Sequence, residues 1–225
     1  MPKHIAVIPD GNRRFAKKMN IPLAKAYAMG IDKTIDVMEW SKQAGVKMIT
    51  SWGFSTENFK RSAIEKKFLF RLFEGKIREF LENGRFKKEQ LCVKILGNRS
   101  MFPKGLIKSI DQMEAETSQY KKFQLNLALN YGGRQEIIDA CNKILVSGTK
   151  HIEASDFQKF LFTSDIPDPD MILRTSGEQR LSGFMPWQSA YSELIFIDSL
   201  WPELTKEDFL SAVNEYENRQ RRFGR

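Results

Sequence analysis

Short apolar runs alternate along the chain with longer segments in which apolar residues recur at helical spacing. Residues 5–8 are apolar and mostly β-branched, which predicts a buried first strand that Pro9 ends, because proline cannot donate to a sheet ladder. Further strands are predicted at residues 46–54, 91–96, 123–130, 171–173 and 194–197. Helices are predicted at residues 24–44, 62–83, 106–113, 137–145 and from residue 205 onward, with a short helix near 155–162. This alternation predicts βαβ crossovers and a single α/β domain over residues 1–225, with a six-stranded, mainly parallel sheet flanked by helices.

The predicted helix at residues 62–83 carries more apolar bulk than one core-facing stripe requires. Its start has Ser62 and Glu65 at the spacing of a capping box. Two interpretations of the apolar excess stay open: a deeply buried helix or dimer contact, or a helix with one face lining a long apolar tunnel. The residues concerned are Phe68, Leu69, Phe70, Leu72, Phe73, Ile77, Phe80 and Leu81.

Composition narrows the class of protein only partly. A net charge of +8 over 225 residues fits an anionic partner, and diphosphates, an acidic membrane surface and nucleic acid all qualify. Cys92 and Cys141 lie in apolar periodic segments and are expected to be buried thiols, whereas two distant histidines do not suggest zinc. No apolar run approaches the roughly 18 residues of a membrane span, so a cytoplasmic protein is expected.

The first candidate site follows the first strand. Gly11 permits unusual backbone angles, Asp10 or Asn12 can cap the next helix, and the free N–H groups at a helix start attract phosphate, with Arg13 and Arg14 adjacent. A carboxylate there would repel phosphate unless a divalent cation, Mg²⁺, bridges the two. The stretch therefore predicts a magnesium diphosphate site, against the alternative of a capped surface helix with solvated basic residues. No Walker-type loop or G-x-G-x-x-G motif supports ordinary nucleotide binding.

Two later segments add candidate chemistry. Residues 55–61 form a polar loop at the carboxyl end of a strand, where open α/β sheets bind ligands, although ordinary turn chemistry explains it equally well. Arg174 and Arg180 flank a Ser/Gly-rich loop, so guanidinium forks, the Ser182 hydroxyl and loop N–H groups could clamp a phosphate. The alternative is a basic surface loop. Glu193, entering an apolar strand, is either a second metal-associated carboxylate or the salt-bridge partner of an arginine.

Five segments together resemble the cis-prenyltransferase family, the undecaprenyl diphosphate synthase-like isoprenyl transferases. They are IAVIPDGNRRFAKK, GFSTENFKRS, LNYGGRQEI, DPDMILRTSGEQRLSGFMPWQSAYSELIF and NRQRRFGR. The resemblance spans nearly the whole chain and implies a single α/β domain, a homodimer, and an apolar tunnel that houses the growing isoprenoid. It also implies a Mg²⁺-dependent reaction that elongates an allylic prenyl diphosphate with isopentenyl diphosphate in cis geometry. A lipid product implies, in addition, peripheral contact of a cytoplasmic enzyme with a membrane surface.

The resemblance also implies residue roles. Asp10 matches the catalytic, metal-binding aspartate, Glu193 the second metal carboxylate, and Asn58 the position assigned a proton-accepting role. Since a neutral amide is a poor base, a water or the departing diphosphate are alternative proton acceptors. Arg222 and Gly224 fit a terminal Arg-x-Gly that reaches the partner's site. The implied substrate-binding positions are Gly11, Asn12, Arg13, Arg14, Phe15, Leu23, Tyr27, Ser55, Thr56, Glu57, Phe59, Arg61, Arg174, Arg180, Leu181, Ser182, Arg222 and Gly224.

The departures from the family pattern cluster at the allylic site. Leu23 and Tyr27 stand where the family usually has arginine and histidine, and Phe15 and Phe59 where it usually has tryptophan. We therefore predict an active enzyme with an altered allylic donor, such as a short one, or an altered acceptor, such as an alcohol. One rival is a non-catalytic subunit that supports another cis-prenyltransferase. The functional residues are all present, which argues against this rival. A nucleic-acid-binding domain is the second rival; no reading module supports it, and no nucleic acid partner is expected.

Overall fold

The six strands form one parallel sheet in the order β3-β4-β2-β1-β5-β6. The structure is a computed structural model that describes residues 1–219. All six predicted strands are confirmed, and no strand end differs from the prediction by more than two residues. The strands are β1 (His4–Ile8), β2 (Met48–Ser55), β3 (Leu91–Leu96), β4 (Phe123–Tyr131), β5 (Met171–Arg174) and β6 (Glu193–Phe196).

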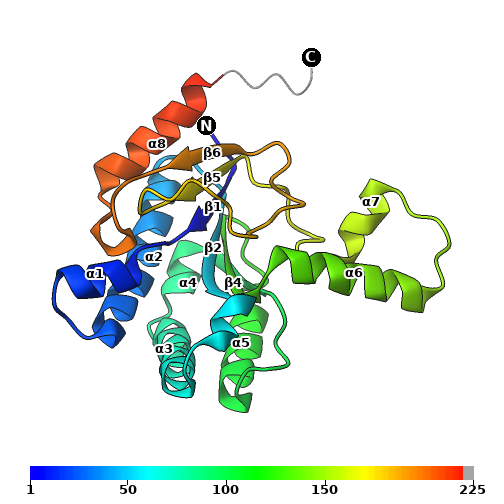
Figure 1. Cartoon of the computed structure of the whole chain (residues 1–225), viewed down its shortest axis with the longest axis horizontal. Helices are drawn as coiled ribbons and strands as arrows, with labels where there is room; N and C mark the ends of the chain where they lie inside the picture. The colour runs from blue at the N-terminus through cyan, green and yellow to red at the C-terminus, as the bar shows by residue number, and fades with distance from the viewer. Residues whose placement is uncertain (220–225) are drawn as a thin grey trace.

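Helices precede or follow most strands, as the apolar periodicity predicts (Figure 1). The segment predicted as a polar loop contains the 3₁₀ helix η1 (Thr56–Lys60), and the short helix α4 (Arg85–Glu89) was not predicted. The α-helices are α1 (Asn12–Lys18), α2 (Leu23–Gln43), α3 (Ala63–Glu82), α4 (Arg85–Glu89), α5 (Lys104–Thr117), α6 (Gly133–Ser147), α7 (Ala154–Phe157) and α8 (Lys206–Asn218), and the 3₁₀ helices are η1 (Thr56–Lys60), η2 (Gln158–Phe160) and η3 (Trp201–Glu203). In the described residues, no helix is both long and apolar enough to cross a bilayer.

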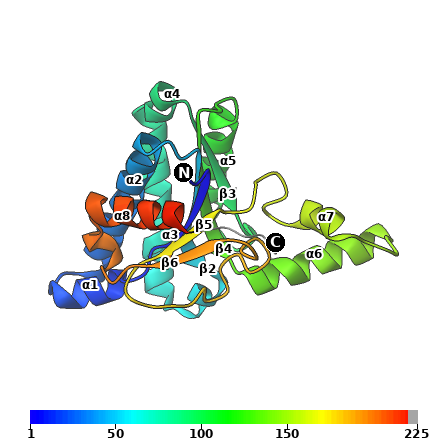
Figure 2. The same cartoon turned by 90° about the horizontal axis from the view of Figure 1, so that it is seen from above.

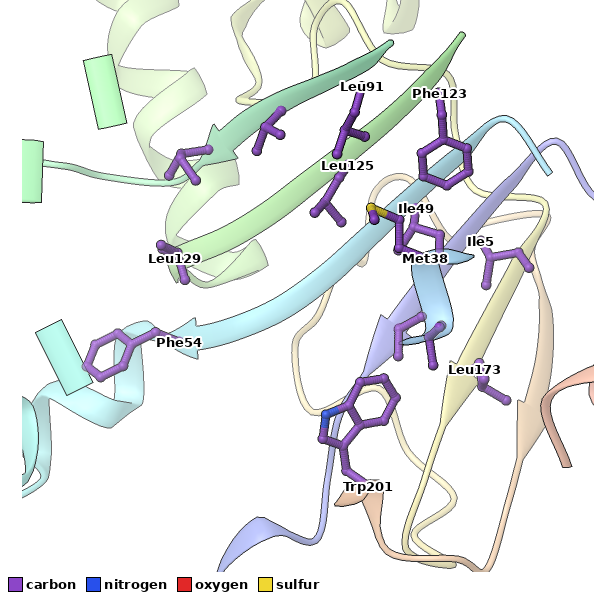
Figure 3. Close-up of a cluster of buried hydrophobic side chains, with 14 of the residues drawn as sticks. Ile5, Met38, Ile49, Phe54, Leu91, Phe123, Leu125, Leu129, Leu173 and Trp201 are labelled. Atoms are coloured by element: carbon purple, nitrogen blue, oxygen red, sulfur yellow. The ribbon is translucent and has the colours of Figure 1, made fainter. Parts of the chain in front are cut away.

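The two faces of the sheet are buried in different ways. Strand alternation sends Ile5 and Val7 into a large cluster that the apolar residues of α2, α3, α5 and α8 complete, as Figure 3 shows in part. Ala6 and Ile8 face a smaller cluster on the opposite side, with Phe184. Figure 2 shows that α6 and α7 extend away from the sheet and its helices.

Two predicted helix caps differ from the structure. Gly11, with a φ of 115°, precedes α1, and neither predicted residue caps it. The reason is that the carboxylate of Asp10 is bound to Arg174 and Asn12 already belongs to the helix. At α3 the Ser62 hydroxyl accepts the N–H of Glu65, as predicted, but the Glu65 carboxylate bonds to Tyr27 instead of returning to the cap.

Cys92 is buried, as predicted, but Cys141 is exposed, so the prediction of a buried thiol was wrong there. The helical periodicity of α6 arises from two apolar faces. Ala140 and Ile144 turn inward, whereas Ile138, Cys141 and Leu145 turn outward.

The central strand β1 lies between β2 and β5, where the strand order reverses. Such a switch point opens a crevice at the carboxyl ends of the strands. Because Ile8 of β1 lies in register with Arg174 of β5, Asp10 leaves the sheet beside the Arg174 side chain. The register of these two strands therefore determines the centre of the site.

Candidate active site

Asp10 and Arg174 form an ion pair at the switch point of the sheet. Arg174 Nη2 donates to Asp10 Oδ2 at 2.8 Å, and Thr175 Oγ1 donates to the backbone oxygen of Asp10 at 2.7 Å. Burial alone would raise the pKa of Asp10, but the hydrogen bond and charge of Arg174, helped by Ser176 and Arg14, outweigh burial and lower that pKa. Asp10 is therefore an anion at neutral pH.

The loop after β5 wraps around the Arg174 guanidinium. Nη1 donates to the Ser182 hydroxyl at 2.8 Å and also to the backbone oxygen of Arg180. Ser176 and Ser182 adopt left-handed backbone conformations, with φ of 78° and 53°, which non-glycine residues adopt at a cost. Arg174 is 4% exposed and its Nε has no partner, so the loop holds a buried guanidinium with one donor still available.

A cavity of about 480 Å³ begins at these groups and continues between the sheet and the helices α2, α3 and α5. It follows β4 from Leu129 back to Leu125, and Met113 of α5 lines it too. Leu69, Phe73, Ile77 and Phe80 of α3 also line it, together with Lys76. Phe70, seven residues before Ile77 and therefore on nearly the same side of α3, packs at tilted ring angles against Phe54 and Phe102, with 5.5 Å between ring centroids in each pair.

The segment after β2 supplies polar groups to the same cavity. Asn58 Oδ1 accepts the backbone N–H of Ser55 at 3.1 Å, which closes a reciprocal capping box at the start of η1. Asn58 also lines the cavity. Arg61 Nη1 donates to the Tyr27 hydroxyl at 3.0 Å, so this segment is joined to α2.

Glu65 is a functional candidate that sequence reasoning missed. Its Oε1 accepts a 2.8 Å hydrogen bond from the Tyr27 hydroxyl and lies 3.3 Å from Arg61 Nη1. The capping-box spacing assigned this carboxylate to the backbone of its own helix. No local pattern could indicate the alternative partner, because Tyr27 is 38 residues away in sequence.

Nine of the predicted site residues line the cavity: Asp10, Asn12, Tyr27, Ser55, Glu57, Asn58, Arg61, Arg174 and Ser182. Several others lie beside it in other surroundings. Phe15 and Leu23 belong to an apolar cluster with Leu200, and Phe59 packs edge-on against Phe54 at 5.1 Å between ring centroids.

The remaining predicted residues lie at the rim or elsewhere. Arg14 Nη1 donates to the backbone oxygen of Ser176 at 3.2 Å, and Leu181 packs against the smaller apolar cluster. Thr56 closely approaches Gly132, where a Cβ would lie 2.3 Å from its hydroxyl oxygen. Gly11 precedes α1, and Arg13 and Arg180 pair with Glu65 and Glu178. Arg222 and Gly224 lie outside the described residues.

Glu193 is not among the residues that line the cavity. One of its carboxylate oxygens accepts a 3.0 Å hydrogen bond from Arg219, which is the salt-bridge arrangement that the sequence left open. Within residues 1–219, no group of three or more His, Cys, Asp or Glu side chains is arranged to hold a metal ion.

The Asp10 carboxylate nevertheless fits the role of one Mg²⁺ ligand. Besides the Asp10 carboxylate, the cavity is lined by Asn12, whose Oδ1 is buried and has no hydrogen-bond partner. The amide lies so close to α2 that a Cβ at Gly30 would be 2.3 Å from Oδ1, so Gly30 gives it room. Mg²⁺ usually binds through one or two carboxylates plus substrate phosphates, and this donor set meets that requirement.

Comparison with known proteins identifies the class of enzyme. Residues 8–224 match the family model described as "Putative undecaprenyl diphosphate synthase". The chain is 46% identical over 230 residues to the tritrans,polycis-undecaprenyl-diphosphate synthase (geranylgeranyl-diphosphate specific) of Picrophilus torridus, covering all of this chain and 90% of that protein. It is 44% identical over 228 residues to the isoprenyl transferase of Thermotoga maritima, covering all of this chain and 97% of that protein.

A solved structure confirms the fold. Lavandulyl diphosphate synthase from Lavandula x intermedia, in complex with dimethylallyl diphosphate, superposes with a TM-score of 0.94 at 31% identity, covering all of this chain and 98% of that one. The chain therefore belongs to the undecaprenyl diphosphate synthase family and is a cis-prenyltransferase.

Proposed function

We propose that this enzyme elongates an allylic prenyl diphosphate with isopentenyl diphosphate, in a Mg²⁺-dependent reaction with cis geometry. The observation that carries the proposal is the buried Arg174, bonded to Asp10 and Ser182, at the opening of an apolar cavity. The constellation suits a diphosphate, and a volume of about 480 Å³ suits a hydrocarbon chain. Ligand cavities of roughly 300–1,000 Å³ bury most of a small ligand.

In this mechanism the chain's residues hold charge in place before the reaction. Arg174 and Ser182, with Arg180 at the rim, bind the diphosphate of isopentenyl diphosphate, and Arg174 Nε supplies the unused donor. Asp10 and Asn12 would hold Mg²⁺, which supplies positive charge to the departing diphosphate of the allylic donor. Because Arg174 is already locked by three partners, stabilising the transition state requires no reorganisation of this group.

The allylic C–O bond breaks, the isopentenyl double bond attacks the allylic carbon, and a proton then leaves the new chain. Asn58 is a weak candidate to accept it, since its Oδ1 already accepts the N–H of Ser55. We assign Asn58 a donor role toward a diphosphate oxygen and assign the proton to the departing diphosphate. Glu193, paired with Arg219, keeps its metal role as a prediction from the resemblance alone.

The donor side of the cavity supports an altered allylic site. Leu23 packs in an apolar cluster, and the Tyr27 hydroxyl is engaged by Glu65 and Arg61. Neither side chain supplies a cation to a diphosphate. The double variant Leu23→Arg with Tyr27→His should therefore change the donor affinity or the product pattern, and an unchanged enzyme would contradict an altered site.

The deciding experiment incubates the protein with Mg²⁺, radiolabelled isopentenyl diphosphate and, separately, dimethylallyl, geranyl, farnesyl and geranylgeranyl diphosphates. Asp10→Ala serves as the inactive control, and products are sized by chromatography. We expect label in a longer prenyl chain that depends on Asp10. Absence of product with every donor would refute the proposal and direct attention to an alcohol acceptor or to a missing catalytic partner.

A homodimer is also proposed, on the outward face of α6. Ile138, Leu145 and Val146 are 53%, 75% and 89% exposed, and Cys141 lies on the same face. An apolar stripe at i, i+3 and i+7 on a helix that extends from the body is typical of a surface covered by another chain. Because the resemblance implies a homodimer, we propose a second copy of this chain as the occupant.

A further inference from the structure

Glu65 places a negative charge against the arginines on the donor side of the cavity. Its Oε1 accepts from the Tyr27 hydroxyl at 2.8 Å and lies 3.3 Å from Arg61 Nη1 and 3.6 Å from Arg13 Nη1. One hydrogen-bond donor and two guanidinium charges thus surround one oxygen of a side chain that is only 15% exposed. The carboxylate occupies guanidinium edges that a phosphate oxygen would otherwise contact.

The neighbouring arginine does not relieve this competition. Arg14 lies 3.7 Å from Asp10 and 3.6 Å from Glu178, so its charge is shared with two carboxylates. Every guanidinium group of the segment at residues 13–14, as well as Arg61, therefore has a carboxylate neighbour. A diphosphate with several negative charges has to compete with these resident anions.

Tyr27 holds the carboxylate in this position. Burial, and next the hydrogen bond to Glu65, raise the pKa of Tyr27 to about 12, so its hydroxyl remains a donor at neutral pH. The same hydroxyl accepts from Arg61 at 3.0 Å. Tyr27 thus joins the anion and the cation, and it occupies the position where the family pattern has a histidine.

We propose that Glu65, held by Tyr27, is a resident counter-ion that lowers the affinity of the donor site for an allylic diphosphate and so determines how tightly the donor binds. The inference rests on the proposed function, because it assigns the surroundings of Arg13 and Arg61 to the allylic diphosphate. A counter-ion role and a purely positioning role of Glu65 predict opposite changes in the affinity for the allylic diphosphate. Removing the charge of a competitor tightens binding, whereas removing a positioning partner weakens it.

The test is Glu65→Gln, which keeps the shape of the side chain and an oxygen that accepts from Tyr27. Calorimetry on the full chain with Mg²⁺ uses farnesyl thiolodiphosphate, an unreactive donor analogue, and then isopentenyl diphosphate with the analogue saturating. We expect the Kd of the analogue to fall about fivefold to tenfold, the effect of one partly exposed charge. The Kd of isopentenyl diphosphate should stay within about twofold, because Glu65 does not contact Arg174 or Ser182.

Glu74→Gln is the matched control, because Glu74 lies on the same helix and pairs with Arg78, and neither residue lines the cavity. It should leave both Kd values unchanged. An unchanged analogue Kd in Glu65→Gln, or a weaker one, would overturn the counter-ion role, and the weaker one would make Glu65 a positioning partner of Arg61. If the unsubstituted enzyme formed no product with any of the four donors, the proposed function itself would fail, which distinguishes the two failures.

Discussion

Arg174→Lys keeps the positive charge beside Asp10 but removes the planar fork that the loop surrounds. In the structure, Nη2 donates to Asp10 and Nη1 donates to Ser182 Oγ and to the backbone oxygen of Arg180. A single ammonium group cannot reach both sides of this arrangement. Because the Arg174 side chain is only 5% exposed, water has little access to replace the lost partner.

The magnitude follows from the contacts that lysine loses. We expect the ammonium group to retain Asp10 and to lose the 2.8 Å bond to Ser182. A hydrogen bond to a charged group contributes about 1.5–3 kcal/mol, and about 1.4 kcal/mol corresponds to a factor of ten. Losing the Ser182 bond should lower the free energy of unfolding by about 2 kcal/mol. Lysine also lacks the Nε donor that we assign to the diphosphate, so the KM for isopentenyl diphosphate should rise about tenfold to a hundredfold.

The assay is steady-state kinetics with isopentenyl diphosphate varied at saturating donor, together with urea unfolding. Arg85→Lys is the matched control, because Arg85 also bridges two acceptors, Glu89 at 2.6 Å and Glu39 at 2.8 Å, and does not line the cavity. It should lose at most about 1 kcal/mol of stability and keep its KM. A KM within about twofold of the unsubstituted enzyme in Arg174→Lys would refute the argument that the fork matters beyond its charge.

Three further predictions concern pH, product length and assembly. Burial lowers the pKa of His4 from 6.5 to about 4. As the pH falls between these values, His4 becomes protonated in the unfolded chain but stays neutral in the folded chain. Relative to His4→Gln, unfolding free energy measured in urea should fall by about 3 kcal/mol between those pH values, and parallel pH curves would contradict this. Met113→Ala should enlarge the cavity and lengthen the product, as chromatography would reveal, whereas Met38→Ala, equally buried but away from the cavity, should only lower stability by about 2–5 kcal/mol. Val146→Glu should convert the proposed dimer to monomers in sedimentation, and an unchanged mass would remove α6 from the interface.

Local patterns predicted the secondary structure well because the buried side of each helix or strand determines the spacing of its apolar residues. Ile5 and Val7 alternate with Ala6 and Ile8 toward opposite faces of a sheet that is covered on both sides. The same reasoning misjudged Cys141, since periodicity reveals that a face is apolar but not what covers it.

Prediction of the candidate site from the sequence also depended on what local patterns can and cannot indicate. Asp10, Asn58, Arg174 and Ser182 were found because their motifs place them next to strand ends, and the structure brings all four to one cavity. Glu65 was missed because its local spacing satisfied a helix cap, and its carboxylate was then assigned to the wrong partner.

The sequence by itself determined the family and the parallel α/β architecture, and it named polar candidates for the site. Only the tertiary structure decided which of these side chains pair, because pairing depends on the strand order that sets Asp10 beside Arg174, 164 residues later in the chain. It also decided that apolar residues of α3 line a cavity, and that Tyr27 meets Glu65. Periodicity describes one element at a time, whereas a site requires side chains from several elements to lie within hydrogen-bond distance.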